Sequence, residues 1–296
     1  MSIFRRLNKK EASGGAPDLR DVLRSLAKNE IAIKEDGKGK AVAPDASKIG
    51  GKPYLPADFI WPTFQSYDDD VIRPLSFFCQ LRLEEVKAYD RDGVLPEKGI
   101  LSFFYECESA TWGFDPADYG AAKVFYFENI DGFSQRELPD DLAAEYRIPE
   151  IALSFRSQVS YPTFDEFADY SDLACEWDEY DKVRAKLGVD PERDPEGAKI
   201  LGYADTIQDE MLTECEWIHR GLYCGNVNST RNTPEDVRAE VKAHAKDWTL
   251  LLQLSTIATD NFEYMFGDCG MLYFYIRKDD LAARRFGETE FCVQCC

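Results

Sequence analysis

The residues best suited to chemistry are polar side chains set inside or beside apolar runs. Gln80 lies within the apolar run 74–83, and Gln253 lies within Trp248–Leu254. A buried amide without hydrogen-bond partners costs on the order of 1–3 kcal/mol, so each glutamine must find partners. Bonds to neighbouring backbone would make both glutamines structural. The alternative is a cleft between two similar strand units, in which Gln80, Gln253, Trp61 and Asp268 bind a small ligand.

Asp268 lies in the segment Gly267-Asp268-Cys269-Gly270, which is typical of a turn that leads into a strand. A carboxylate at this position either stabilises the turn or binds a cation or ligand. Because the chain carries 55 acidic residues, spacing alone identifies no pair of carboxylates as general acid and general base. Whether the protein is an enzyme is therefore left open, and no catalytic residue is assigned.

Cysteine and histidine offer a further candidate. Cys215 and His219 are four residues apart on a predicted helix, so they share one face. Together with Glu216 or Cys224 they would form a thiolate–imidazole pair or part of a metal site. The alternative is a buried cysteine on the apolar face of the helix beside an exposed histidine.

A second cysteine pair, Cys292 and Cys295, has Cys-x-x-Cys spacing. It ends a predicted strand, whereas redox pairs favour a helix N-terminus, so we interpret it as structural. The sequence contains no Walker loop, no Gly-x-Gly-x-x-Gly after a strand and no Gly-x-Ser-x-Gly. It therefore predicts no metal and no cofactor. It leaves open whether Cys215 with His219, or Cys292 with Cys295, has a reactive role.

The charge of the chain bears on its partners. The net charge is −20, from 35 basic and 55 acidic residues, which argues against nucleic acid and against anionic membranes. Residues 165–216 contain 17 acidic and 5 basic residues, a net of −12 (5 − 17). This segment either attracts a basic protein partner, as an inhibitor or immunity-type protein would, or only favours solubility. The candidate partner-binding residues are Asp165, Glu166, Asp169, Asp172, Glu176 and Glu179.

Hydrophobic periodicity predicts the elements that position these residues. It indicates helices over 18–29, 164–187, 206–220 and 279–285, and another that begins with Thr233 as its N-cap. Thr163 is the predicted N-cap of the second helix. Apolar and aromatic runs indicate strands at 31–33, 74–83, 99–107, 123–128, 151–159, 248–254, 270–276 and 289–295. The predicted fold is α+β, with mainly antiparallel sheets and a helical acidic middle segment.

Two pieces of the chain repeat in the same order. The run Pro74-Leu-Ser-Phe-Phe-Cys-Gln80-Leu81 resembles Trp248-Thr-Leu-Leu-Leu-Gln253-Leu254, and 99–105 resembles 270–276. The glutamine precedes the glycine by 19 residues in the first copy and by 17 in the second. We interpret the pattern as an internally duplicated strand–turn–strand unit at about 74–107 and 248–276. The alternative is the general likeness of apolar strands.

From about Lys48 onward, the order of several short motifs resembles the YwqG-like family of uncharacterised bacterial proteins. The motifs are Gly50-Gly-Lys-Pro-Tyr-Leu-Pro56, Trp61-Pro62, Leu75-Ser-Phe-Phe-Cys-Gln80, Leu201-Gly-Tyr203 with Ile207-Gln208, Leu250-Leu-Leu-Gln253, Gly267-Asp-Cys-Gly270 and Leu272-Tyr-Phe274. The sequence departs from the family at Ala204, where a proline usually follows Leu-Gly-Tyr. The resemblance implies one compact α+β domain and no particular reaction.

The domain organisation follows from these observations. Residues 1–17 read as a loose N-terminal arm, and 18–296 read as a single domain. No apolar run is long enough to span a bilayer, and no apolar segment follows the basic N-terminus, so a cytoplasmic location is expected. Nine cysteines with irregular spacing fit reduced, structural thiols. Two hypotheses remain: a protein that binds a basic partner, and a protein or enzyme that binds a small ligand. The oligomeric state is open.

Overall fold

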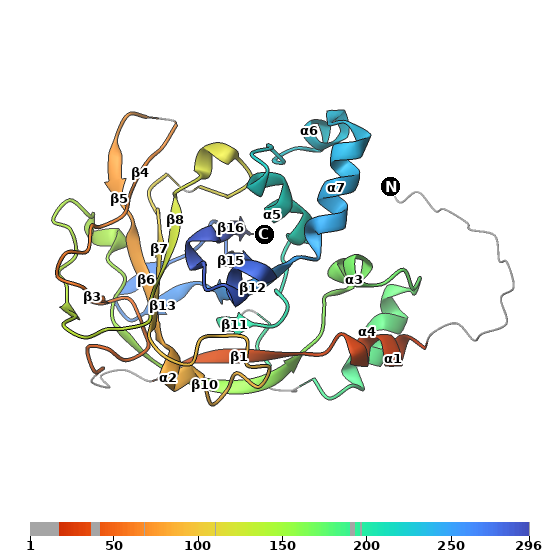
Figure 1. Cartoon of the computed structure of the whole chain (residues 1–296), viewed down its shortest axis with the longest axis horizontal. Coiled ribbons are helices and arrows are strands. Elements are labelled where there is room, and N and C mark those ends of the chain that lie inside the picture. Colours follow the sequence, from red (N-terminus) through yellow and green to blue (C-terminus); the bar gives the residue numbers. More distant parts are fainter. Residues whose placement is uncertain are drawn as a thin grey trace, which may run out of the picture.

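The computed structural model describes residues 18–36, 42–67, 69–109, 111–189, 193–195 and 197–295. The predicted arm at residues 1–17 lies outside this part of the chain. The described residues form a ten-stranded antiparallel sheet that curls toward a barrel (Figure 1). Its strand order is β16 (Glu290–Gln294), β15 (Met271–Arg277), β12 (Trp248–Leu254), β11 (Lys199–Leu201), β1 (Lys28–Glu35), β10 (Ile151–Ser160), β2 (Lys48–Ile49), β6 (Ser76–Arg82), β7 (Ile100–Tyr105) and β8 (Ala122–Phe127). The expected α+β fold with mainly antiparallel strands is confirmed.

Short elements complete the described chain. Three two-stranded ladders pair β3 (Tyr54–Leu55) with β9 (Ser134–Gln135), β4 (Thr63–Gln65) with β5 (Ile72–Pro74), and β13 (Ile257–Thr259) with β14 (Phe262–Tyr264). The α-helices are α1 (Leu19–Ser25), α2 (Leu83–Val86), α3 (Phe164–Tyr170), α4 (Trp177–Ala185), α5 (Leu212–His219), α6 (Val227–Asn232), α7 (Glu235–Ala245) and α8 (Lys278–Ala282). Single 3-10 turns form at Pro116–Asp118, Ala144–Tyr146 and Phe286–Glu288.

The sheet consists of two half-sheets that meet where β1 pairs with β10. The first half-sheet contains β10, β2, β6, β7 and β8, and the second contains β1, β11, β12, β15 and β16. Each contains one of the similar hairpins. The register of β6 against β7 shifts after Phe77, and that of β12 against β15 shifts after Leu250. Both shifts begin three residues before a glutamine, Gln80 or Gln253, which supports the predicted duplication.

The two glutamines make matching hydrogen bonds. Gln80 lies opposite Lys48 of β2, and Gln253 lies opposite Lys199 of β11. Each amide donates to a backbone carbonyl two residues before that lysine, at 2.7 Å for Gln80 and 3.0 Å for Gln253. Each amide oxygen accepts at 2.9 Å from the backbone N–H six residues after the lysine. Both glutamines therefore join two segments of their own half-sheet.

Strands β6, β7, β12 and β15 are buried on both faces, which explains why they read as continuous apolar runs. Every residue of β12 is buried. On one face, Trp248 and Leu250 pack in a cluster with Met211, Leu212 and Ala245, which lie at or in α5 and α7. On the other face, Leu251 belongs to the large core cluster that joins the two half-sheets. Leu252 and Leu254 belong to the same large core cluster, so β12 changes from one core to the other at its register shift after Leu250.

The predicted helix over 164–187 is wrong as a single element, because it forms two helices, α3 and α4. The predicted N-cap is correct: the Thr163 hydroxyl accepts a hydrogen bond from the Glu166 N–H. The break begins at Ser171, whose Oγ accepts from the Leu173 N–H at 3.2 Å. Such local bonds compete with helix formation. The break lets Phe167 of α3 and Tyr180 of α4 pack in one cluster.

Two other predicted helices are too long. The helix over 18–29 ends at Ser25, because residues from Lys28 onward pair with β10 as strand β1. The helix over 206–220 begins only at Leu212. The N–H groups of Ile207 and Gln208 both donate to the Gln294 side chain, which holds this backbone outside a helix. The last predicted cap is displaced by one residue, since α7 has Pro234 and not Thr233 at its N-cap.

Candidate functional site

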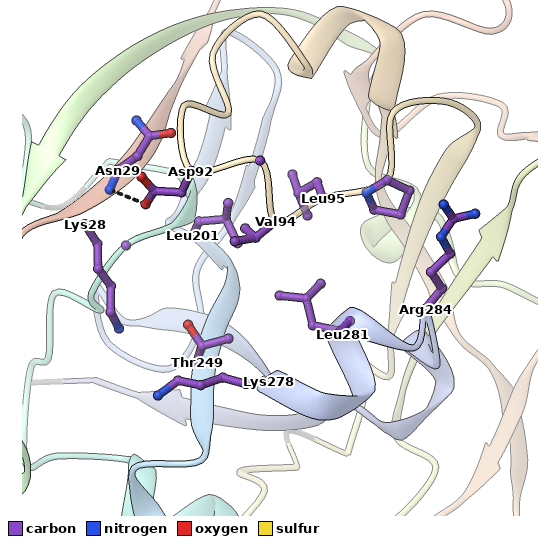
Figure 2. Close-up of a pocket in the computed structure, with 14 residues that line it drawn as sticks. Lys28, Asn29, Asp92, Val94, Leu95, Leu201, Thr249, Lys278, Leu281 and Arg284 are labelled. Carbon is purple, nitrogen blue, oxygen red and sulfur yellow. Dashed lines mark hydrogen bonds between the residues drawn. The ribbon is translucent and has the colours of Figure 1, made fainter.

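The best candidate site is a cavity of about 580 Å³ between the two half-sheets (Figure 2). The second half-sheet supplies Lys28 from β1, Thr249 from β12 and the segment 278–284 that contains α8. The first half-sheet supplies the loop 92–96, which lies between α2 and β7. We call this space the basic cavity, because three basic side chains and one acidic side chain line it among the described residues.

The loop 92–96 is fixed to β1 by hydrogen bonds. The backbone N–H of Asn29 donates to the Asp92 carboxylate at 2.8 Å, and the Asn29 side-chain oxygen accepts from the Arg91 N–H at 2.9 Å. Within the loop, the Asp90 carboxylate accepts from the N–H groups of Gly93 and Leu95 at 3.0 and 2.8 Å. These bonds fix the conformation of one wall of the cavity. The Asp92 carboxylate is hydrogen-bonded to the backbone of β1.

Lys28 has an unusual environment for a lysine. Its amine lies 3.9 Å from the centre of the Tyr203 ring and 5.2 Å from that of Tyr170, which is cation–π geometry. Burial and, to a smaller extent, the charge of Lys278 lower the pKa of Lys28 to about 8, although Glu166 and Asp92 oppose the shift. Among the described residues, no carboxylate forms an ion pair with Lys28 within 4.0 Å.

The cavity has a polar end and an apolar side. In Figure 2 the amines of Lys28 and Lys278 gather near Thr249, while Val94, Leu95 and Leu281 lie together away from them. The Lys278 amine donates to the carbonyl of Lys246 at 2.6 Å and remains exposed. The Thr249 hydroxyl has no hydrogen-bond partner within the part of the chain that the structure describes. This arrangement suits a molecule with an anionic end and an apolar end.

Arg284, the third basic residue of the lining, has a different role. It lies beyond the apolar side in Figure 2, and its guanidinium is 3.1 Å from the Glu128 carboxylate. Both partners are about half exposed. An exposed pair of this kind contributes little to stability, and its charge is already matched. Lys28 and Lys278 are therefore the cations that an anion would meet.

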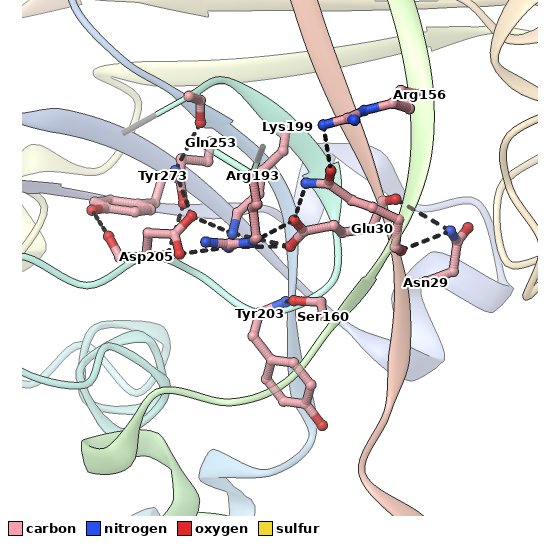
Figure 3. A network of polar contacts seen from close by, with 12 residues as sticks. Asn29, Glu30, Arg156, Ser160, Arg193, Lys199, Tyr203, Asp205, Gln253 and Tyr273 are labelled. Carbon is pink, nitrogen blue, oxygen red and sulfur yellow. Dashed lines mark hydrogen bonds and ion pairs between the residues drawn. The ribbon is translucent and has the colours of Figure 1, made fainter. Parts of the chain in front are cut away.

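A buried polar network lies near the basic cavity (Figure 3). The Glu30 carboxylate is 2.8 Å from Arg193 Nε and 3.2 Å from the Lys199 amine. Lys199 also contacts Asp205 at 2.5 Å, and Asp205 contacts Arg193 at 2.6 Å. Burial raises the pKa of Glu30, but Lys199 and Arg193 outweigh it and lower the pKa to about 2. These four charges compensate one another, so we assign the network a structural role.

The first half-sheet contains a smaller counterpart of this network. Lys48 is fully buried, and its amine lies 2.8 Å from the Glu150 carboxylate. Lys48 precedes Gly50-Gly51 as Lys199 precedes Leu201-Gly202. Both lysines are followed by an isoleucine and then, within two residues, by a glycine. This repeated pattern in the sequence could have indicated that the two lysines occupy matching positions. No comparable signal marks Lys28, Thr249 or Lys278.

The structure does not bring the four predicted ligand-binding residues together. Four strands separate β6, which contains Gln80, from β12, which contains Gln253. The Trp61 indole donates to the Leu75 carbonyl at 2.8 Å and packs against Phe104. Asp268 is exposed in a turn before β15. None of the four lines the basic cavity. The hydrogen bonds of both glutamines fit the structural alternative, and ligand binding by these residues stays a prediction.

The six predicted partner-binding residues differ in exposure. Asp165, Asp172, Glu176 and Glu179 are exposed, whereas Glu166 is buried and Asp169 is partly buried. Burial raises the pKa of Glu166, and the nearby charges of Lys28 and Lys199 oppose this shift. Burial also raises the pKa of Asp169, and Glu210 adds to that increase. Only the four exposed carboxylates are available to a partner.

The histidine and cysteine candidates have other neighbours. Cys215 is fully buried with its sulfur 3.8 Å from that of Cys292, and burial raises its pKa. His219 packs on the Trp248 ring, and its Nδ1 lies 3.5 Å from Glu290. Raised thiol pKa values disfavour nucleophilic cysteine. No group of three or more His, Cys, Asp and Glu side chains that would hold a metal occurs among the described residues.

Comparisons with known proteins give a family but no activity. Across the described residues, no helix combines the length and apolar character needed to cross a membrane. No curated protein matches the chain. A family described as a domain of unknown function, DUF1963, matches residues 47–295. The match spans the similar hairpins of both half-sheets and most of the cavity lining. The chain therefore belongs to the DUF1963 family.

Proposed function

We propose that the protein binds a small organic anion with an apolar part in the basic cavity. The observation that carries the proposal is the concentration of lysine at this site in a chain with a net charge of −20. Elsewhere, basic side chains such as Arg73 and Arg82 have carboxylate partners within 3.0 Å. Desolvating Lys28 beside the second cation Lys278 is unfavourable unless an anion compensates them.

The cavity lining defines how such a ligand would lie. Its carboxylate would meet Lys28, Lys278 and the Thr249 hydroxyl, and its apolar part would contact Val94, Leu95 and Leu281. Charge-assisted hydrogen bonds would fix the anionic end. A volume of about 580 Å³ lies in the range of small-molecule sites. The site would therefore select ligands with one negative charge and a short branched or linear carbon chain.

The test is a calorimetric titration with 4-methylpentanoate and with its neutral amide. We expect the carboxylate to bind and the amide to bind at least ten-fold more weakly. Lys278→Gln and Lys28→Met should each weaken carboxylate binding by about ten-fold or more, which corresponds to the loss of one charge-assisted contact. Lys87→Met is the matched control, since Lys87 is an exposed lysine that pairs with Glu97 away from the cavity. Equal binding of acid and amide would overturn the proposal.

A second candidate function is association with a basic protein through the acidic helical segment. The exposure of Asp165, Asp172, Glu176 and Glu179 on and around α3 and α4 supports this candidate. Electrostatic attraction to such a surface is strong at low salt and weakens as salt rises. Native mass spectrometry of gently purified protein should then detect a basic polypeptide that dissociates with added salt. Replacing the four carboxylates by lysine should abolish this association and leave 4-methylpentanoate binding intact.

We also propose that the chain is a YwqG-like member of its family and that it works in the cytoplasm. The Gly-Gly-Lys-Pro-Tyr-Leu-Pro and Leu-Gly-Tyr motifs support the first proposal. The free thiols of six described cysteines fit a reducing compartment and support the second; they are Cys79, Cys107, Cys175, Cys215, Cys224 and Cys292. Fractionation of the native host, with detection of the protein by antibody, tests the location.

A further inference from the structure

We propose that Lys28 is a nucleophile that forms an imine with an anionic carbonyl compound, namely a 2-oxo acid with an apolar side chain. This inference rests on the proposed binding of an organic anion in the basic cavity, and it assigns a chemical class and a reactive atom to that site. The arguments are the position of the Lys28 amine, the groups around it and the distribution of polar and apolar side chains along the cavity.

The Lys28 amine is positioned at the cavity by aromatic faces and not by a carboxylate. Tyr203 lies below it at 3.9 Å, and Tyr203 is fixed in turn by a hydrogen bond from its hydroxyl to the Leu26 carbonyl at 2.7 Å. The backbone of Lys28 is held in β1 by its pairing with Ser160. By contrast, Lys48 and Lys199 form close ion pairs. Because no ion pair within the described residues engages the Lys28 amine, its lone pair is available for reaction once the amine loses a proton.

Burial of Lys28 favours the neutral amine. Burial and the neighbouring cation Lys278 both lower the pKa of Lys28, whereas Glu166 and Asp92 act in the opposite direction. Glu166 does not act as a full counter-charge, because burial raises its own pKa. Desolvation and an adjacent cation are the two means by which proteins activate a lysine nucleophile. With a pKa of about 8, Lys28 loses its proton more readily than an ordinary lysine does.

A 2-oxo acid fits the two lysines better than a simple aldehyde does. Its carboxylate and its carbonyl are adjacent, so Lys278 and Thr249 can hold the carboxylate while Lys28 attacks the neighbouring carbon. The apolar side chain would then extend toward Val94, Leu95 and Leu281, as the arrangement in Figure 2 allows. The division of roles follows exposure, since Lys278 is exposed and Lys28 is partly buried.

The step balances without an oxidant or a reductant. The lone pair of the neutral amine forms a C–N bond, and the electron pair of the carbonyl moves to its oxygen, which takes up a proton. The resulting carbinolamine loses its hydroxyl group as water, and the C=N bond forms. Both hydrogens of the amine leave with the carbonyl oxygen as one molecule of water. The carbon next to the C=N bond is then activated toward later loss of a proton.

Reductive trapping tests the proposal on the full chain. The protein is incubated at pH 7.5 with 4-methyl-2-oxopentanoate and sodium cyanoborohydride, which reduces the imine to a stable secondary amine. Intact mass and peptide mapping should show one adduct, at Lys28, that forms at least ten-fold faster than on any exposed lysine. Lys28→Arg should lose this adduct, and the control Lys87→Arg should retain it. Adducts spread over exposed lysines, or a rate unchanged in Lys28→Arg, would overturn the proposal.

Two further measurements separate this inference from the function on which it rests. Mapping of the wild-type protein needs no variant, so the site of the adduct is known even if Lys28→Arg folds poorly. Calorimetry with 4-methylpentanoate, which has no carbonyl next to its carboxylate, measures binding alone. Binding of this acid without an adduct at Lys28 would reject the imine and leave the anion site standing. If the acid does not bind and no adduct forms at Lys28, both the anion site and the imine are rejected.

Discussion

Lys48 and Lys199 occupy matching positions in the two half-sheets, but their partners differ. Lys199 contacts two buried carboxylates, those of Glu30 and Asp205, whereas Lys48 contacts Glu150, whose side chain is 35% exposed. Removing one partner of a buried ion pair leaves an uncompensated charge, which costs about 3–5 kcal/mol. The same change at Lys48 leaves a carboxylate that water can reach. The two lysines therefore provide a comparison of burial with chemistry held constant.

We expect Lys199→Met to lower the free energy of unfolding by about 3–5 kcal/mol and Lys48→Met by clearly less, about 1–3 kcal/mol. Urea unfolding followed by tryptophan fluorescence measures both. Within the second half-sheet, the cost of Lys199→Met should shrink in the Glu30→Gln background, since the stranded charge is then absent. Equal costs for the two lysines would contradict this account of burial.

Glu214 is expected to make stability depend on pH. Burial raises its pKa to about 7, and Glu210 and Asp209 add to the shift. Because this value lies above the ordinary 4.5, the contribution of Glu214 is fully present below about pH 4.5 and is lost as pH rises through 7. Glu214→Gln should therefore be about 1–3 kcal/mol more stable than the wild type at pH 8, and equal to it at pH 4.5. Urea unfolding at the two pH values measures the difference, and a difference independent of pH would contradict the assignment.

For individual residues, the sequence predicts the buried setting of some and not of others. Gln80 and Gln253 are predicted as buried amides because a polar residue inside an apolar run is a local signal. Lys28 has no such signal, since 35 basic residues occur in the chain and its setting is created by Tyr203, Tyr170 and Lys278. These residues are distant in sequence and meet only through the curl of the sheet. A single sequence does not show that these residues lie close together in the folded protein.

Among the elements, long buried strands are predictable and short or polar ones are not. The hairpins β6–β7 and β12–β15 follow from continuous apolar runs, since both faces of the sheet are covered. Strand β1 was expected only at 31–33, because its start, Lys28-Asn29-Glu30, is polar. These residues are satisfied by tertiary partners, such as the Glu30 contacts with Arg193 and Lys199. Strands of two or three residues, such as β2 and β11, are specified by pairing alone.

The turn after β11 contains a glycine that we expect to be essential for the pairing of β11 with β1. Gly202 has φ +76°, and an added Cβ would lie 2.5 Å from the Glu30 Cβ. Gly188, which follows α4, has φ +84° with nothing within 4 Å of an added Cβ. Gly188→Ala should therefore cost about 1 kcal/mol, the price of the left-handed backbone. Gly202→Ala should cost several kcal/mol, because it also separates β11 from β1. Thermal unfolding compares them, and similar costs would show that the close approach to Glu30 is unimportant.

For the whole molecule, the charge of −20 predicts a dependence of stability on salt. Like charges destabilise the compact state, and salt screens them. Raising NaCl from low concentration to about 0.5 M should raise the Tm by roughly 2–5 °C. Neutral replacements at Asp165, Asp172, Glu176 and Glu179 should reduce this increase, because these exposed carboxylates lie in the most acidic segment. An increase that is unchanged in the variant would place the repulsion elsewhere.

The position of β1 determines how the chain can be divided into two fragments that reassemble. The family match begins at residue 47, yet β1 lies between β10 and β11 in the middle of the sheet. A chain that starts at residue 47 would lack the strand that joins the half-sheets. A synthetic peptide of residues 18–36 should then restore the fold by fragment complementation. Because Lys28 belongs to that peptide, an isotopically labelled or shortened amine could be placed at the cavity wall by chemical synthesis alone.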